Sequence, residues 1–162
     1  MKKDLSIMVD DVKFNFRVSC IMKYKGKVLV EKNPEVNHSV FPGGRVMTME
    51  DTKEALIREI KEEMHFDISK KDIELKAIIE NFFRSNGVKY HEIGFVYKIE
   101  LNEKDELVHR KELANYDSEN SYYEYVNIDD IAKEPILPSV VKNIINQEKF
   151  ERIVTKDIEE CD

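Results

Sequence analysis

Five charged residues with regular spacing are the part of this chain best suited to chemistry. They are Glu50, Arg58, Glu59, Glu62 and Glu63. A turn rich in Pro and Gly, Phe41–Gly44, comes shortly before them. Carboxylates clustered beside such a turn offer an all-oxygen site for a hard cation, and Mg²⁺ prefers these ligands with phosphate oxygens completing its octahedral shell. The stretch therefore indicates a site for a hard cation such as Mg²⁺.

A helix must position these side chains, and the residues after the turn predict one. Thr52 is the predicted N-cap, and residues 55–57 are good helix interior residues. At about 100° per residue, the apolar residues fall on one face and the carboxylates on a second face roughly a quarter-turn away. The apolar face holds Leu56, Ile57, Ile60 and Met64, and the acidic face holds Glu59, Glu62 and Glu63. One face therefore enters a core while three carboxylates lie beside it.

An acidic run is usually just a solvated helix face, and this alternative has to be weighed. Glutamates at positions i, i+3 and i+4 repel one another by a few tenths of a kcal/mol per pair. A surface helix normally alternates the signs of its charges to avoid this cost, although Arg58 and Glu62 are spaced so that they can pair. The cluster therefore fits a metal site better than a solvated surface.

The same stretch resembles the signature of the Nudix hydrolases, Gly-x5-Glu-x7-Arg-Glu-U-x-Glu-Glu-x-Gly-U, in which U is a bulky aliphatic residue. The matching positions are Gly44, Glu50, Arg58, Glu59, Ile60, Glu62 and Glu63. Two positions depart, because His65 replaces the Gly and Phe66 replaces an aliphatic residue. The Gly ends the helix in a left-handed conformation that costs other residues roughly 1–2 kcal/mol, and His tolerates that conformation better than most residues.

The resemblance implies a Nudix fold, with a mixed β-sheet between α-helices, and hydrolysis of a nucleoside diphosphate linked to another group. It implies Mg²⁺, with Mn²⁺ as an alternative. The implied metal ligands are Gly43, through its carbonyl, Glu59, Glu62 and Glu63. Glu50 and Arg58 would orient these ligands. Water would attack phosphorus while a carboxylate takes its proton, and the choice between Glu59 and Glu119 as that base stays open.

Composition limits the remaining classes of protein. The chain has 162 residues, which suits one domain over residues 1–162, and it is 41% hydrophobic and 36% charged, as expected of a soluble protein. Its net charge of -7 opposes nonspecific binding to nucleic acid or an anionic membrane. No run approaches the roughly 18–20 apolar residues of a membrane span. Cys20 and Cys161 form no metal motif, and a reducing cytoplasm is the simplest location.

Strands are predicted before the motif. Residues 12–22 alternate apolar and polar side chains, which predicts a half-buried strand, and residues 28–30 are its return strand. Cys20 is then a core residue. Arg17 lies on the polar face, and in Nudix proteins an Arg in this first strand can reach a substrate phosphate or base; a solvated strand cation is the equal alternative. His38 is expected to be an ordinary loop residue.

Two longer strands are predicted after the motif, at residues 73–83 and 90–101, joined by a Ser-Asn-Gly hairpin turn. Phe82 and Phe83 could stack on a substrate base, although ordinary sheet packing is the commoner role for such residues. Glu92, on the second of these strands, could support the metal.

The polar residues 102–121 are predicted to form a loop, and long loops in compact domains tend to be functional or disordered. In several Nudix enzymes a Glu shortly before a late strand is an extra metal ligand or base. Here residues 122–127 are the predicted late strand, and Glu119 is the candidate. Glu112 and Glu106 are rivals, and a solvated loop is an equal alternative.

The C-terminal part completes an α+β pattern. A helical turn is predicted from residue 129 and a helix from Pro138, followed by a small strand or sheet contact at residues 150–154. The acidic tail, residues 156–162, is predicted to fray.

Three functional classes remain, and fold alone does not decide among them. The first is a pyrophosphohydrolase acting on a small nucleotide. The second is a Nudix-fold isomerase, which would need a catalytic Cys near the metal, and Cys20 is the candidate. The third is a noncatalytic nucleotide-sensing module, which would usually lack a motif Glu, whereas all are present. Since many Nudix proteins dimerise, a homodimer is compatible with each class.

Overall fold

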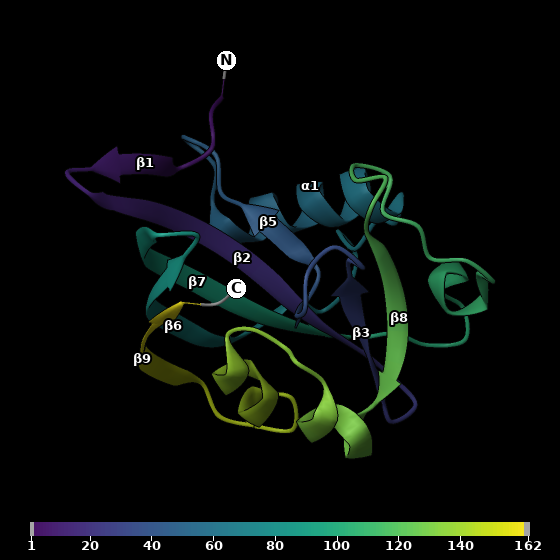
Figure 1. The fold of residues 1–162 in the computed structure, drawn as a ribbon. Helices are drawn as coiled ribbons and strands as arrows, with labels where there is room; N and C mark the ends of the chain where they lie inside the picture. Colours follow the sequence, from purple (N-terminus) through teal and green to yellow (C-terminus); the bar gives the residue numbers. More distant parts are fainter. Residues whose placement is uncertain (1, 161–162) are drawn as a thin grey trace.

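One mixed sheet forms the body of the protein, and it lies between a helix on one side and short 3₁₀ segments on the other (Figure 1). This computed structural model describes the backbone of residues 2–160 and the side chains of residues 2–156. The strands are β1 (Ser6–Val9), β2 (Val12–Tyr24), β3 (Lys27–Lys32), β4 (Ser39–Val40), β5 (Gly43–Arg45), β6 (Glu74–Ser85), β7 (Val88–Glu100), β8 (Tyr122–Asn127) and β9 (Glu151–Glu160). The helical segments are α1 (Thr52–Met64), η1 (Glu106–His109), η2 (Ile128–Lys133) and η3 (Ser139–Ile144). The predicted α+β class is confirmed.

Strand β2 is the centre of the sheet. Along one edge it runs parallel to β7 over nearly its full length, from Val12 opposite Lys89 to Lys23 opposite Glu100. Three antiparallel strands, β1, β5 and β3, share its other edge in turn. The sheet continues from β7 to β6 and β9, and from β3 to β4 and β8. Because β5 leads into α1, β2 holds the motif against the middle of the sheet.

Helix α1 begins and ends at residues that satisfy its free backbone groups or tolerate its terminal conformation. Asp51, rather than the predicted Thr52, is the N-cap, because its carboxylate accepts the N–H groups of Lys53 and Glu54, each at 2.9 Å. The Glu54 side chain accepts the Asp51 N–H in return, which completes a capping box. His65 follows the helix in a left-handed conformation, with φ 49° and ψ 41°, as the motif requires of this position.

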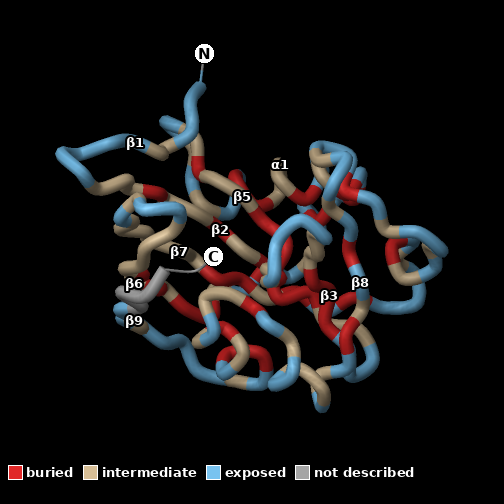
Figure 2. The backbone as a smooth tube through the Cα atoms, viewed as in Figure 1, coloured by how far each residue is buried: buried red, intermediate tan, exposed pale blue. Residues whose placement is uncertain are grey.

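Both faces of the sheet are covered, so the protein has two hydrophobic cores. The first lies against α1, where Leu56, Ile60 and Met64 are buried as predicted. The second lies on the opposite face, under η2 and η3, and includes Ile21 of β2. The prediction of a half-buried β2 is therefore wrong, because its second face packs against the C-terminal segments instead of facing water. Figure 2 shows β3 largely buried and β1 largely exposed.

Strands β6 and β7 form the predicted hairpin, with their ends shifted by one to two residues. Asn86 and Gly87 connect them with φ values of 50° and 74°. A two-residue turn of type I′ requires positive φ at both of its central positions, and Asn-Gly supplies them at low cost. The turn residues therefore set the register of the hairpin, which places Phe83 opposite Tyr90.

The C-terminal part differs from the prediction in two places. The predicted final helix is only the 3₁₀ segment η3. The tail that was expected to fray continues as β9 to Glu160, because it pairs in parallel with β6; residues 161–162 lie outside the described part. The late strand β8 and the helical turn η2 are confirmed. None of the helices that the structure describes is long and apolar enough to cross a bilayer.

Candidate functional site

The Gly43–Gly44 turn brings the motif helix against β2. A Cβ atom on Gly43 would lie 2.1 Å from the carbonyl oxygen of Val18, so glycine lets the turn touch the strand. A Cβ atom on Gly44 would lie 2.2 Å from the carboxyl carbon of Glu59. The absence of a side chain at Gly44 therefore leaves the space that the Glu59 carboxylate occupies. Packing against Glu59 thus requires the glycine that the motif has at this position.

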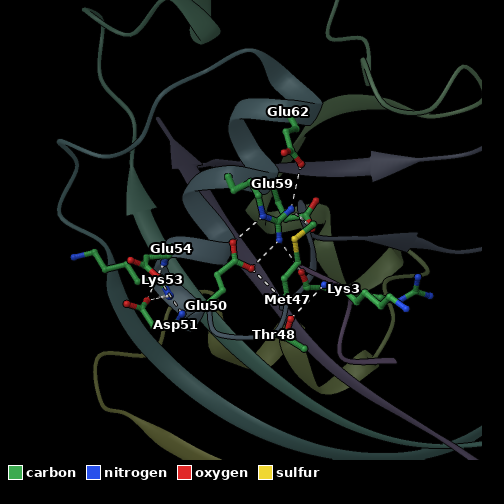
Figure 3. Close-up of polar contacts among 11 residues, drawn as sticks. Lys3, Met47, Thr48, Glu50, Asp51, Lys53, Glu54, Glu59 and Glu62 are labelled. Carbon is green, nitrogen blue, oxygen red and sulfur yellow. Dashed lines mark hydrogen bonds and ion pairs between the residues drawn. The ribbon is translucent and has the colours of Figure 1, made fainter. Parts of the chain in front are cut away.

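Arg58 is the centre of a polar cluster, because all five of its N–H donors are used. Its Nε and Nη2 donate to the two carboxylate oxygens of Glu50 at 2.8 and 3.0 Å, and Nη2 also donates to the Arg45 carbonyl at 2.9 Å. Its Nη1 donates to Glu59 at 2.9 Å and to Glu62 at 3.1 Å. Figure 3 shows these three glutamates around one guanidinium group. The arrangement supports an orienting role for Arg58.

Glu50 is the deepest partner of Arg58 and fixes it to the chain segment before the helix. Its side chain is only 5% exposed, and its Oε2 also accepts the backbone N–H of Met47 at 2.9 Å. The Arg58 guanidinium holds the pKa of the Glu50 carboxyl below its usual value. The bidentate pair therefore anchors Arg58, while its remaining N–H groups face the carboxylates of the helix.

Glu59 and Glu63 lie deeper than Glu62, and burial changes their ionisation. The Glu59 side chain is 12% exposed and that of Glu62 is 47% exposed. Burial raises the pKa of Glu59, although Arg58 opposes the shift, and burial raises the pKa of Glu63 to about 8. The Tyr123 hydroxyl donates to Oε2 of Glu63 at 2.8 Å. A cation close to these buried carboxylates would offset the cost of their ionisation.

The chemistry of these donors fits a hard cation, although their present positions do not form a complete shell. Among the residues with described side chains, no group of three or more His, Cys, Asp or Glu is placed to hold a metal ion together. Arg58 engages Glu59 and Glu62, and Tyr123 engages Glu63. Three features support the fit to a hard cation. All the side-chain donors are carboxylate oxygens, the pKa values of Glu59 and Glu63 are raised, and Gly44 leaves space beside Glu59.

The loop after β7 holds the C-terminal end of α1. Arg110 donates to the carbonyl groups of Met64 and His65. The backbone N–H of Tyr116 donates to the Glu63 carbonyl at 2.8 Å, and its ring stacks on that of His65 with centroids 3.8 Å apart. The stacked ring and the capped carbonyls explain how histidine occupies a position that usually holds glycine. Nothing close to His65 in the sequence indicates these distant partners.

A pocket of about 210 Å³ lies on the face of the sheet opposite α1. Strands β2, β7 and β6 form its floor, and the loop before β5 and the segment leading into η3 form its walls. Arg17 and Phe83, two of the predicted substrate residues, line this pocket. Phe82 lies outside it and packs against His91, with ring centroids 4.4 Å apart. The structure thus brings together two of the three residues predicted to bind substrate.

Five polar residues of this pocket were not predicted to bind substrate: Ser19, His38, Asn81, Ser85 and Glu92. His38 is more than a loop residue, because its Nδ1 is buried without a hydrogen-bond partner among the described residues. Glu92 lies in the pocket rather than with the glutamates of α1. Asn81 is 7% exposed. The signal that could have found it is its place two residues after Ile79, on the face of β6 that is buried there, where sheet packing alone would favour a hydrophobic residue.

The loop glutamates lie apart from the carboxylates of α1. Glu119 and Glu112 are exposed, and Glu106 forms an ion pair with Arg110. Within the described side chains, no hydrogen bond or ion pair joins any of these three to Glu59, Glu62 or Glu63. The predicted extra carboxylate from this loop is therefore not in place in this arrangement.

A different carboxylate lies near Glu63. Glu31 of β3 is opposite Tyr123 of β8 in the sheet register. The side-chain amide of Asn115 donates to Glu31 at 3.3 Å and to the Tyr123 hydroxyl at 3.1 Å. The negative charge of Glu31 contributes, after burial, to the raised pKa of Glu63. Sequence reasoning missed Glu31 because strand register brings it to the site, and no local motif marks it.

Comparison with known proteins places the chain in a family. The NUDIX domain model matches residues 13–145. The mRNA-decapping protein D10 of fowlpox virus (strain NVSL) is 30% identical over 131 residues, which cover 78% of this chain and 55% of that protein. The chain therefore spans about half the length of the curated relative that it matches.

Solved structures with similar folds share little sequence with this chain. The MutT protein from Bacillus halodurans has a TM-score of 0.69 at 18% identity, over 88% of this chain and 90% of that one. The MutT NUDIX hydrolase from Burkholderia pseudomallei has a TM-score of 0.64 at 18% identity, over 82% and 98%. The E. coli dihydroneopterin triphosphate pyrophosphohydrolase has a TM-score of 0.62 at 17% identity, over 83% and 92%. These likenesses show the fold, and because the NUDIX domain model covers most of the chain, the protein belongs to the NUDIX family.

Proposed function

We propose that this protein hydrolyses a diphosphate bond in a nucleoside diphosphate linked to another group. The observation that carries the proposal is the pair of buried carboxylates, Glu59 and Glu63, beside the Gly43–Gly44 turn. That turn pairs with β2, whose Arg17 lines the pocket on the other face of the sheet. A divalent ion at the carboxylates and the Arg17 guanidinium would together offset the charge of a diphosphate.

The proposed ion is Mg²⁺, with Mn²⁺ as the alternative. The proposed ligands are the Gly43 carbonyl, Glu59, Glu62 and Glu63. When bound, the ion lowers the pKa of a water molecule and neutralises charge on the diphosphate. Arg58 and Glu50 keep the carboxylates of the helix oriented, and the Tyr123 hydroxyl fixes one oxygen of Glu63 so that the other remains available.

Glu59 is the proposed general base. Its carboxylate takes a proton from the water whose oxygen attacks phosphorus, while the bond from phosphorus to the leaving phosphate oxygen breaks. Burial raises the pKa of Glu59, which makes the carboxylate a better proton acceptor than a solvated one. Glu119 stays the second candidate and would need a movement of its loop, because it is exposed in this structure.

A turnover screen tests the proposal. Sugar nucleotides, dinucleotides and nucleoside triphosphates are incubated with the protein and Mg²⁺, and phosphate is measured after coupling to a phosphatase. We expect turnover of at least one class, loss of that turnover in EDTA, and recovery with Mg²⁺ or Mn²⁺, because the site holds only oxygen donors. Full activity in EDTA would contradict the metal site. Inactivity on every class would favour a noncatalytic sensor.

Capped RNA is a second candidate substrate, favoured by the similarity to an mRNA-decapping protein. An mRNA cap joins a nucleotide to RNA through phosphoanhydride bonds, so its hydrolysis belongs to the same reaction class. Short capped RNA and the same RNA with a 5′-triphosphate are compared with free nucleotides. Release of a nucleoside diphosphate from capped RNA alone supports decapping, and equal or faster turnover of free nucleotides contradicts it.

The isomerase alternative is disfavoured by the position of its candidate nucleophile. Cys20 is fully buried in the core beneath α1, and burial raises the pKa of its thiol. A reactive cysteine needs access and a lowered pKa. We also propose a reducing, cytoplasmic setting, in keeping with this unpaired thiol. A homodimer remains part of the proposal, and light scattering coupled to size exclusion measures it directly.

A further inference from the structure

The pocket opposite α1 has a floor in which three strands are in register. Asn15 of β2 and Asn81 of β6 both lie opposite Glu92 of β7. One step along, Arg17 and Ile79 both lie opposite Gly94. Side chains two residues apart on a strand share a face, so Glu92 and Gly94 present neighbouring positions of the same floor. The floor thus has a polar row, formed by Asn15, Glu92 and Asn81. Beside it is a second row with Gly94 at its centre.

Gly94 makes the middle of this floor flat. A Cβ atom built on Gly94 would have no other atom within 4 Å, and its backbone is ordinary strand, so the missing side chain leaves open space. On either side of that space lie the Arg17 and Ile79 side chains, which also line the pocket. A planar ring can therefore lie on the sheet over Gly94, with one edge toward the polar row.

The polar row is a prepared site for hydrogen bonds. Asn15 is 3% exposed; it accepts a hydrogen bond from Ser6 at 2.7 Å, and its amide nitrogen lies 3.5 Å from Oε2 of Glu92. The Asn15 amide orients the Glu92 carboxylate through Oε2, and each of the two carboxylate oxygens still has a lone pair that can accept from a ligand. Asn81 lines the pocket and is 7% exposed, with no side-chain hydrogen bond among the described residues. Its amide atoms are not fully buried, so they offer the pocket a donor and an acceptor that a ligand can use.

We propose that this pocket selects guanine nucleotides, with Glu92 and Asn81 reading the edge of a base that lies over Gly94. A carboxylate only accepts hydrogen bonds, and guanine presents two adjacent donors, its ring N1–H and its 2-amino group. The guanine O6 beside them accepts from the Asn81 amide. Adenine would turn its unprotonated N1 toward the carboxylate and lose these bonds. The inference rests on the proposed function in taking a nucleotide as the ligand.

The path from this pocket to the carboxylates of α1 is short. Arg17 lies opposite Arg45 and Ser19 lies opposite Gly43 in the pairing of β2 with β5. Arg17 is also close enough for its charge to lower the pKa of Glu59 against the effect of burial. A guanine over Gly94 therefore directs its phosphates past Arg17 toward the turn and the glutamates beside it.

Binding of nucleoside monophosphates tests this selection without turnover, because they contain no diphosphate bond. GMP, IMP and AMP are titrated into the metal-free protein and followed by ligand-observed NMR. We expect GMP to bind at least about tenfold more tightly than AMP, with IMP weaker than GMP because it lacks the 2-amino group; one bidentate base contact accounts for a difference of this size. Equal affinities for GMP and AMP would overturn the proposal.

Three variants locate the effect. Glu92→Gln should remove the preference for GMP over AMP, whereas Glu100→Gln, an exposed position at the end of the same strand, should retain it. Gly94→Val should abolish binding of all three nucleotides with an unchanged thermal unfolding curve, because a Cβ atom there meets no protein atom. A retained preference in Glu92→Gln, or full binding by Gly94→Val, would overturn the assignment.

The binding result and the turnover screen can fail separately. Preference for GMP in a protein that hydrolyses no nucleotide would remove the proposed function and leave the guanine pocket. Hydrolysis in a protein with no base preference would remove the guanine pocket and leave the proposed function.

Discussion

Glu63 is the residue at which ionisation and stability are most tightly linked. Burial raises its pKa from 4.5 to about 8 in the folded protein. The folded state therefore holds a proton that the unfolded state has already released, and stability falls as pH rises between these two values. We expect metal-free protein in EDTA to lose stability over this range in urea unfolding, and Glu63→Gln to show a flatter profile. Identical slopes for both proteins would show that Glu63 does not carry the effect.

Glu63 and Ile60 separate catalysis from folding on the same helix. Glu63→Gln keeps the shape and helix propensity of the side chain but removes an anionic oxygen, so kcat should fall by orders of magnitude while the fold persists. Ile60→Ala keeps every carboxylate but opens a cavity beneath α1, where Ile60 is fully buried; the expected cost is roughly 2–5 kcal/mol. Kinetics and thermal unfolding in EDTA measure the two effects, and the reverse pattern would show that Glu63 is a structural residue.

Residues of the helix could be predicted because their spacing follows the helix period. Leu56 and Ile60 are buried and Glu59 lies beside them, as the periodicity indicated. Tyr123 and Asn81 could not be predicted in the same way. Both residues are on strands that pair with strands distant in sequence. The register of that pairing places them at their sites, and no local sequence pattern encodes it.

At the scale of elements, the loop after β7 acts as a clamp on the end of α1. Tyr116→Ala removes the ring that stacks on His65, although Tyr116 is itself 56% exposed. We expect a loss of about 0.5–1.5 kcal/mol, the usual range for an aromatic pair, and faster proteolysis of the loop. Phe150→Ala, an exposed aromatic outside the helices and strands, is the control. Equal behaviour of both variants would show that the clamp adds nothing.

The same loop contains the three glutamates that compete with Glu59 for the role of general base, so variants in the loop test this assignment. We expect Glu119→Gln, Glu112→Gln and Glu106→Gln to keep kcat close to that of the unmodified protein, because these side chains lie away from α1 in the structure. Glu59→Gln should lower kcat strongly. A large drop in Glu119→Gln alone would instead mean that the loop closes over the substrate and supplies the base.

Elements were predictable where one signal dominated. Alternation and the Asn-Gly turn gave the β6–β7 hairpin, and the motif gave α1. The prediction of a final helix was wrong because the apolar residues there, though spaced as on a helix, are all β-branched. They are Val140, Val141, Ile144 and Ile145. Such residues disfavour helix, and packing against the sheet is satisfied by the shorter η3.

At the scale of the whole molecule, net charge affects the encounter with substrate. The chain carries a formal charge of -7, and its proposed substrate is also an anion. Salt screens this repulsion, so kcat/KM should rise by about two- to threefold between low and physiological ionic strength, at constant free Mg²⁺. A steady fall with salt would show that the field near Arg17 outweighs the net charge.

The overall topology could not be read from the sequence without the family resemblance. Strands β2 and β7 pair in parallel although the motif helix and four other strands lie between them in the chain. This pairing creates the floor around Gly94, and the C-terminal segments cover the second face of β2. Periodicity identifies strands and their apolar faces, but the order of strands depends on long-range packing.

The five hydrogen bonds of Arg58 bear on how the protein endures when metal is scarce. Because its guanidinium already pairs with Glu59 and Glu62, an arriving ion would compete with an internal cation for these two carboxylates. Arg58 therefore keeps Glu59 and Glu62 paired with a cation when no metal ion is bound. Metal supply would then govern how many molecules are active at a given moment, and molecules that have lost their ion but remain folded could become active again without new synthesis.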